Sequence, residues 1–274
     1  MLLFIIILFI LIVLVLLIMN AEKWSNKILF IPDTNHPGPP PNGFNEVYIH
    51  KSIHGWIYEP YSDAPIILHC HGNAGNIRYQ DDMIRLCGIY KVNLLLFDYR
   101  GYGMSIGGSP CASSIKSDAQ VVYDWLVQDK SYAANNIIIY GTSMGGSAAT
   151  HLAANNPCRC LILRSTFSCL QDVVEHQNWK MGWLIKLIIK HCKIDIELHK
   201  ELRRVTVPVM ILHSPDDEVI PHECCDINVR NCDEVEYVRR IKINGYHNDP
   251  VFSAGTDTRV IEAFKDFFNV QYKY

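Results

Sequence analysis

Several features that would each indicate a class of protein are missing from this sequence of 274 residues. Its 10 cysteines include no Cys-x-x-Cys pair, so the usual spacing of a zinc or redox site is absent. No Asn-x-Ser/Thr glycosylation site occurs, which disfavours a secretory lumen. The net charge of −3 leaves no basic footprint, so we expect no nucleic-acid partner. Hydrophobic residues are plentiful, at 49%, which is enough for the core of one large α/β domain.

Basic residues are also missing from the amino terminus, where residues 2–19 form an unbroken apolar run. At about 1.5 Å per residue a helix of this length spans roughly 27 Å, close to the hydrocarbon thickness of a bilayer. A cleaved signal peptide is the alternative, but it would have a basic start, and Met19-Asn20-Ala21 is a poor cleavage site. We therefore predict that residues 1–21 are a single-pass transmembrane anchor, which makes membrane lipids expected partners. Lys23 and Lys27 follow it and favour a cytoplasmic catalytic domain.

Residues 22–43 connect this anchor to the rest of the chain. We expect a short strand at residues 27–31 and a stiff, proline-rich connector after it. From residue 44 to residue 274, apolar runs typical of buried strands alternate with stretches at helical spacing. The expected strands lie at residues 47–49, 53–58, 66–71, 92–97, 137–139, 161–163, 207–213 and 235–243. This alternation predicts one α/β catalytic domain, with a mostly parallel central sheet and helices on both faces.

The stretch Tyr140-Gly141-Thr142-Ser143-Met144-Gly145-Gly146 contains Gly-x-Ser-x-Gly between an expected strand and an expected helix. In this strand–turn–helix context such a serine acts as a nucleophile. The glycines leave room for a sharp, strained turn that exposes the serine hydroxyl at the edge of the sheet. We predict that Ser143 is the nucleophile and that the Met144 N–H, at the start of the helix, helps to form an oxyanion hole. A chance match to the motif is the alternative.

An activated serine needs a base, and the base needs a carboxylate to orient it. Along the chain the expected order is serine, then Asp or Glu, then histidine, each after a strand. His247 follows the last expected strand, so we predict that it is the general base. Asp216 and Asp217 are adjacent in the turn after the strand at residues 207–213. We prefer Asp217, which precedes Glu-Val-Ile-Pro, and Asp216 is the alternative because either aspartate could instead cap the next helix.

An oxyanion hole also needs a second N–H donor, from the loop after an earlier strand. The loop His71-Gly72-Asn73-Ala74-Gly75-Asn76 follows the strand expected at residues 66–71. We predict the Asn73 N–H as this donor, with Ala74 as the alternative. A glycine-rich loop can also cradle phosphate, but no Lys-Ser/Thr follows and the glycine spacing differs from that of a nucleotide site. Catalysis by a serine, a histidine and an aspartate needs no metal and no cofactor, so we expect neither.

Five motifs together resemble those of the α/β-hydrolase superfamily. They are His71-Gly72-Asn73-Ala74-Gly75-Asn76, Asp98-Tyr99-Arg100-Gly101-Tyr102-Gly103, Gly141-Thr142-Ser143-Met144-Gly145-Gly146, Asp217-Glu218-Val219-Ile220-Pro221 and Gly245-Tyr246-His247-Asn248. The sequence is most similar to membrane-anchored serine hydrolases, a branch that includes protein depalmitoylating thioesterases. The resemblance covers about residues 28–270. It implies an α/β-hydrolase fold with Ser143, Asp217 and His247 as the catalytic triad.

The stretch from about residue 166 to residue 204 lies where we expect a small helical lid. A helix at residues 179–192 would place Lys186 and Lys190 beside Trp179 and Trp183. Two interpretations remain open: a buried helix whose lysines extend to solvent, or a lid that contacts lipid headgroups.

Together these features predict a serine hydrolase that cleaves carboxylic esters or thioesters of lipids or lipidated proteins through an acyl-enzyme. A peptidase or amidase that uses the same three residues is one alternative. A catalytically silent scaffold that keeps the fold for binding is another.

Overall fold

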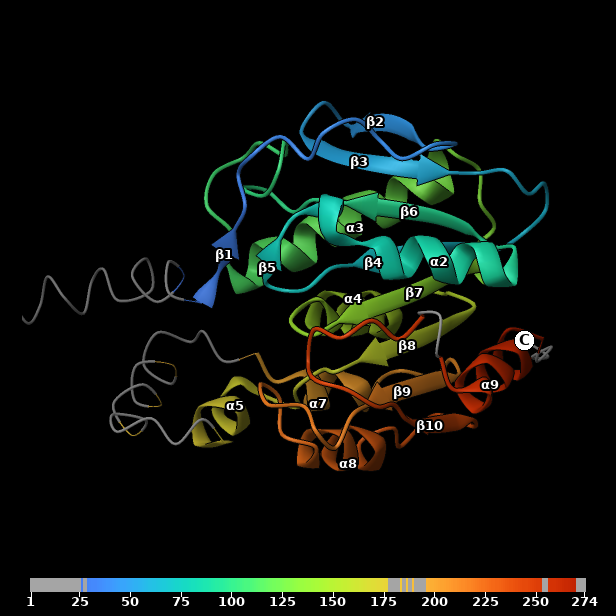
Figure 1. Cartoon of the computed structure of the whole chain (residues 1–274). Coiled ribbons are helices and arrows are strands. Elements are labelled where there is room, and N and C mark those ends of the chain that lie inside the picture. The colour runs from blue at the N-terminus through green and yellow to red at the C-terminus, as the bar shows by residue number, and fades with distance from the viewer. Residues whose placement is uncertain are drawn as a thin grey trace, which may run out of the picture.

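The structure is a computed structural model that describes residues 26, 29–176, 183, 186, 189, 196–252 and 256–269. Its centre is an eight-stranded sheet with the strand order β10-β9-β8-β7-β4-β6-β3-β2 (Figure 1). The strands are β2 (Asn45–Ile49), β3 (Ile53–Tyr58), β4 (Ile66–Cys70), β6 (Asn93–Phe97), β7 (Ile137–Thr142), β8 (Cys160–Arg164), β9 (Val209–His213) and β10 (Val238–Lys242). Neighbouring strands from β10 to β6 are parallel, whereas β3 pairs antiparallel with β6 and β2. The expected mostly parallel sheet is confirmed.

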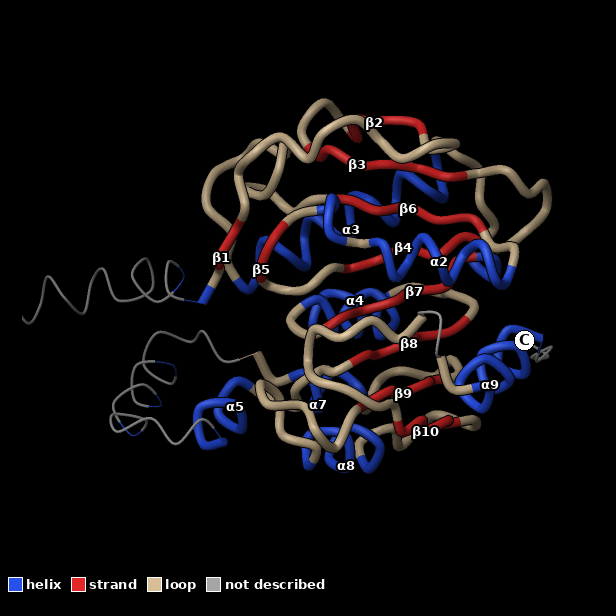
Figure 2. Tube along the Cα trace, in the orientation of Figure 1, coloured by secondary structure: helices blue, strands red, loops and turns tan. Residues whose placement is uncertain are grey.

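Helices cover both faces of this sheet, because its central strands are apolar on both sides (Figure 2). In β7, Ile137 and Ile139 belong to one buried cluster, and Ile138 and Tyr140 belong to a second one. The first cluster includes residues of α3 (Ala112–Gln128), α4 (Gly145–Asn155), α5 (Leu170–His176), α7 (Leu198–Leu202) and α8 (Glu223–Arg230). The second includes residues of α2 (Asp81–Tyr90) and α9 (Thr258–Asn269). Two short 3-10 helices lie at Ile77–Tyr79 and Ala134–Asn136.

The amino-terminal segment of the described chain differs from the expectation of a strand at residues 27–31. Leu29 is helical, and the Phe30 N–H donates to the Asn26 carbonyl at 2.9 Å, as in a helical turn. The strand β1 is only Ile31–Pro32, and it pairs in parallel with β5 (Ala74–Gly75). Proline has no N–H to donate to a ladder, so the pairing stays short.

Two further expectations fall partly or wholly outside the described residues. The predicted anchor at residues 1–21 lies entirely outside them. Among the helices that the structure does describe, none has the length and apolar character needed to cross a membrane. Of the predicted lid at residues 166–204, the structure describes residues 166–176, 183, 186, 189 and 196–204. There, Trp183 is 66% exposed, whereas Ile189 is buried.

The parallel strands place one set of loops along a single edge of the sheet. The loops after β4, β7, β9 and β10 all leave from the carboxyl ends of parallel strands, and these ends lie at the same edge. They carry Asn73, Ser143, Asp217 and His247, respectively. The sheet topology therefore gathers residues that are far apart in the sequence.

Candidate active site

Strand β7 ends in a sharp turn that carries Ser143, and α4 begins two residues later at Gly145. Ser143 has a φ of +51°, in the left-handed region that non-glycine residues rarely adopt. Its N–H donates to the Arg164 carbonyl at 2.9 Å, and its carbonyl accepts the Gly146 N–H at 3.0 Å. Strain of this kind costs about 1–3 kcal/mol and persists where the surrounding structure holds the backbone, as at functional sites. The strand–turn–helix context expected from the sequence is present.

The glycines around Ser143 are required by close backbone packing. A Cβ on Gly145 would lie 2.1 Å from the Cys70 carbonyl oxygen and 2.3 Å from that of His71. A Cβ on Gly146 would lie 2.3 Å from the Thr166 side chain. The start of α4 therefore rests directly on the end of β4, which brings the loop after β4 close to Ser143.

We expect Gly145→Ala to lower the free energy of unfolding by about 3 kcal/mol or more, because backbone carbonyls cannot yield to the added methyl group. Gly88→Ala is a matched control: Gly88 lies inside α2, and a Cβ added there would meet nothing within 4 Å. Alanine at that position should stabilise the helix by about 0.5–1 kcal/mol. Urea denaturation of both variants measures the difference. Equal midpoints for the two variants would contradict the packing described here.

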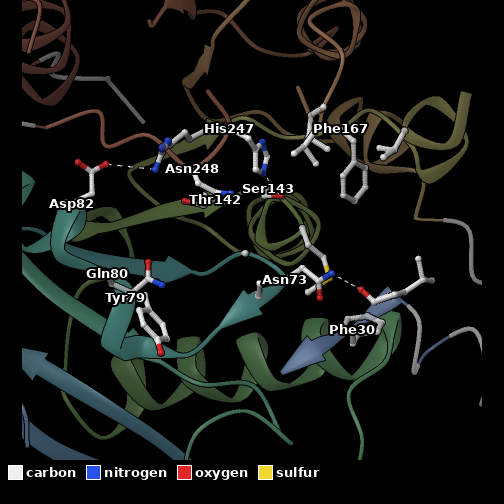
Figure 3. Close-up of a pocket in the computed structure, with 18 of the residues that line it drawn as sticks. Phe30, Asn73, Tyr79, Gln80, Asp82, Thr142, Ser143, Phe167, His247 and Asn248 are labelled. Carbon is white, nitrogen blue, oxygen red and sulfur yellow. Dashed lines mark hydrogen bonds and ion pairs between the residues drawn. The ribbon is translucent and has the colours of Figure 1, made fainter. Parts of the chain in front are cut away.

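The side chains of Ser143, His247 and Asp217 lie in a row at the carboxyl edge of the sheet. His247 Nε2 is 3.1 Å from Ser143 Oγ. On the other side of the ring, His247 Nδ1 is 2.9 Å from Asp217 Oδ2 and 3.0 Å from Oδ1. Figure 3 shows the His247 ring directed at the Ser143 hydroxyl. In this arrangement the imidazole can take the serine proton while the carboxylate holds its other nitrogen.

The structure also separates the two adjacent aspartates. Asp217 is buried, whereas Asp216 is exposed and directs no hydrogen bond toward His247 among the described residues. The Asp217 carboxylate also accepts the N–H groups of Val219 and Ile220, at 3.0 and 2.8 Å. Burial alone would raise the pKa of Asp217, but the hydrogen bonds from His247 and these two N–H groups outweigh it and lower the pKa. An ionised carboxylate can only accept, so His247 Nδ1 carries the proton.

Three charged side chains that sequence reasoning did not single out hold the His247 loop. Glu218 Oε2 accepts the His247 N–H at 2.9 Å. Arg164 and Asp82, whose charged groups lie 3.5 Å apart, both bind residues 249–252. Arg164 Nη2 donates to the first carbonyl of this stretch, and Asp82 accepts two of its N–H groups, at 3.1 and 2.6 Å. A charged residue at the end of an apolar strand next to the nucleophile's strand is the sequence signal that could have identified Arg164.

The loop after β4 passes beside the nucleophile. A Cβ on Gly72 would lie 3.5 Å from the Cβ of Ser143, and Asn73 and Met144 line the same cavity as Ser143. Within the described chain, the backbone N–H groups of Asn73 and Met144 donate to no acceptor. Burial lowers the pKa of His71, the first residue of this loop, so its imidazole is neutral at neutral pH. Two unused N–H groups beside a serine hydroxyl can stabilise negative charge on a substrate oxygen.

Ser143 and His247 line a cavity of about 660 Å³, in the size range of ligand sites. Its apolar lining includes Leu29, Phe30, Met144, Phe167, Leu170, Val173, Ile196, Val219 and Ile220. Its polar lining includes Gln80, Asp81, Asp82, Arg164 and Asn248. Figure 3 shows Phe167 and Asp82 on opposite sides of Ser143. A substrate here would place an apolar part on one side of the serine and a polar part on the other.

Comparisons with known proteins agree with this architecture. Residues 65–195 match a family model described as alpha/beta hydrolase fold. The chain is 31% identical to the uncharacterized protein Rv2307c of Mycobacterium tuberculosis, over 72% of this chain and 68% of that protein. It is 32% identical to the lysophosphatidylserine lipase ABHD12 of Danio rerio, over 59% of this chain. The match covers 46% of the lipase, so the chain spans about half of that relative's length.

Solved structures share the fold at lower sequence identity. The esterase Pf2001 of Pyrococcus furiosus superimposes with a TM-score of 0.70, over 88% of this chain and 98% of the esterase. The two sequences are 17% identical, so this similarity speaks to the fold alone.

Proposed function

The chain belongs to the α/β-hydrolase superfamily, in its branch of α/β-hydrolase domain-containing proteins, and we propose on that premise that it is a serine hydrolase. It cleaves carboxylic esters or thioesters through an acyl-enzyme. One observation carries the proposal: an unbroken hydrogen-bonded row from Ser143 Oγ through His247 to a buried, ionised Asp217, at the wall of a largely apolar cavity.

The proposed reaction has two halves. In the first, His247 Nε2 takes the Ser143 proton while Ser143 Oγ attacks the acyl carbonyl carbon. The carbonyl oxygen becomes an oxyanion that accepts the N–H groups of Asn73 and Met144. The bond to the leaving group then breaks, and the alcohol or thiol leaves with the proton held by His247. In the second half, His247 takes a proton from a water molecule, which attacks the acyl carbon of the acyl-enzyme. The bond to Ser143 Oγ breaks, the acid is released, and His247 gives the proton to Ser143.

The two sides of the cavity suggest how such a substrate lies. The apolar side, with Phe30, Phe167 and Leu170, suits an acyl chain, since each buried methylene contributes about 0.8 kcal/mol. The polar side, with Arg164 and Asn248, suits a hydrophilic leaving group. The relative named as a lysophosphatidylserine lipase cleaves a lipid, and that name supports lipids as the substrate class here. Lipidated proteins offer the same acyl chemistry.

A membrane location forms part of this proposal. The predicted anchor ends at residue 21, and Leu29 already lines the cavity. The intervening stretch of about 8 residues reaches at most roughly 28 Å at ~3.5 Å per residue. An anchored enzyme would therefore keep its cavity close to acyl chains presented at the bilayer surface. Extraction of the full chain from membranes by alkaline carbonate would disprove the anchor.

Fluorophosphonate labelling followed by a substrate panel tests the proposed function. We expect wild-type protein to label at Ser143, and long-chain acyl thioesters or monoacylglycerols to compete with the probe better than peptides do. Competition by peptides alone would favour a peptidase. A folded sample that does not label would favour a catalytically silent scaffold.

A further inference from the structure

The loop that carries Asn73 is bound to the amino-terminal segment of the described chain. In the two-stranded pairing of β1 and β5, Ile31 lies opposite Ala74. The Asn73 side chain connects its loop to the amino-terminal segment: Oδ1 accepts the Ile31 N–H at 3.0 Å, and Nδ2 donates to the Leu29 carbonyl at 2.5 Å. The dashed line at Asn73 in Figure 3 marks the second of these bonds. Both ends of one side-chain amide thus bind the backbone of the same short segment.

Further hydrogen bonds tie this segment and the loop into one unit. The Asp33 N–H donates to the Gly75 carbonyl at 3.1 Å, and the Asp33 carbonyl accepts the Gly103 N–H at 2.8 Å. The buried Tyr102 hydroxyl donates to the Asn73 carbonyl at 2.8 Å. Asn73 is therefore held through its side-chain oxygen, its side-chain nitrogen and its carbonyl. Its backbone N–H is the polar group that these contacts leave unused within the described chain.

We propose that residues 29–33 help to form the oxyanion hole by orienting Asn73. They act through the Asn73 side chain, which is the positioning group. The proposal rests on the proposed function above. By binding the backbone at residues 29 and 31, the side-chain amide fixes the peptide plane that aims the Asn73 N–H at the developing oxyanion. An oxyanion donor is effective only when it is held in place before the reaction, and a displacement of about 1 Å can cost roughly 10²-fold in rate.

This assignment gives the amino-terminal segment a role beyond connection. The predicted anchor ends about 8 residues before Leu29, and Leu29 and Ile31 bind the side chain of the oxyanion donor, Asn73. The rate of the chemical step therefore depends on how residues 29–33 are seated against the loop, and not only on the residues of the triad.

Asn73→Ala in the full chain tests the proposal, because it removes the side-chain bonds to residues 29 and 31, together with a longer one from the Tyr102 hydroxyl at 3.3 Å, and keeps the backbone N–H. We expect kcat to fall by about 10- to 100-fold with KM changed less than about twofold. Asn93→Ala is the matched control. Asn93 is a buried asparagine, whereas Asn73 is partly buried, and its amide likewise binds remote backbone: the N–H and the carbonyl of Tyr61, at 3.3 and 3.0 Å. It begins β6, at the edge of the sheet away from the site, so its loss should lower stability and leave kcat unchanged.

A transition-state analogue separates positioning from general loosening of the site. A long-chain trifluoromethyl ketone forms an oxyanion on Ser143, so its Ki should rise in Asn73→Ala by the same factor by which kcat/KM falls. The Ki of the matching long-chain alcohol, which has no carbonyl group and forms no oxyanion, should stay within about twofold. Equal changes in both inhibition constants would overturn the proposal.

Coupling to the amino-terminal segment is tested with Ile31→Pro, which removes the N–H that binds Asn73 Oδ1. If the Ile31 N–H and the Asn73 side chain act through the same hydrogen bond, the double variant Ile31→Pro/Asn73→Ala should be no slower than Asn73→Ala alone. If the loss of kcat in the double variant equalled the product of the two single-variant losses, the two substitutions would act independently, and this would overturn the proposal. Wild-type turnover by Asn73→Ala would overturn it regardless of how Ile31→Pro folds. Since wild type would still label with fluorophosphonate in these cases, such results leave the proposed function standing.

Discussion

Replacing Ser143 by alanine is expected to lower kcat for a long-chain acyl ester by about 10⁵- to 10⁶-fold and to abolish fluorophosphonate labelling. The physical reason is that the remaining groups have no nucleophile to activate, so only binding and the oxyanion hole can still assist hydrolysis by water. Steady-state and single-turnover kinetics measure the loss. In the described chain the Ser143 hydroxyl bonds only to His247, so stability should change by less than about 1 kcal/mol.

Ser147→Ala is the matched control for this variant. Ser147 lies one turn further along α4, is buried, and its hydroxyl has no hydrogen-bond partner in the described structure. Its replacement should leave kcat and labelling at wild-type levels. If Ser143→Ala kept more than a few per cent of the wild-type rate, Ser143 would not be the nucleophile.

Asp217→Asn is expected to lower kcat by about 10⁴-fold. An amide presents both a donor and an acceptor to His247 Nδ1, so the imidazole is no longer held with its proton on Nδ1 and its lone pair toward Ser143. The neighbouring Asp216→Asn is the control, because Asp216 is exposed and its N–H binds the Ser214 hydroxyl at 3.1 Å. We expect it to retain the wild-type rate. A larger loss in Asp216→Asn than in Asp217→Asn would reverse the assignment.

The lowered pKa of Asp217 also predicts a pH dependence of stability. In the unfolded chain an aspartate titrates near its ordinary value of 3.8, and in the folded protein it titrates below that value. Its contribution to stability is therefore fully present above the unfolded value, and it is lost as the pH falls through the lower folded value. Unfolding free energies measured from pH 6 down to pH 3 should show that Asp217→Asn lacks this acid-dependent loss. It also follows that protonation of Asp217 does not limit turnover above about pH 4.

Much of the fold could be predicted because buried parallel strands are continuous apolar runs. Ile137-Ile138-Ile139 and Leu161-Ile162-Leu163 can be identified as strands from the sequence alone, without knowing which strands lie beside them. Ser143 was identifiable for a related reason, since it closely follows such a run. His247 was identifiable from its place after the last expected strand, although the observed strand β10 is charged and mostly exposed. The strand expected at residues 27–31 was wrong because its conformation depends on the partner loop at residues 74–75, and nothing local specifies that partner.

The sequence by itself determined the order of strands and helices, the turn that exposes Ser143 and the order of the three reactive residues. These depend on local patterns: apolar period, glycines at a strained turn, and polar residues after strands. Only the tertiary structure decided which aspartate faces His247, which charged groups hold the His247 loop, and that Asn73 is bound to residues 29 and 31. Those contacts join residues 29 to 170 positions apart, and their geometry exists only once the sheet has aligned the carboxyl ends of its strands.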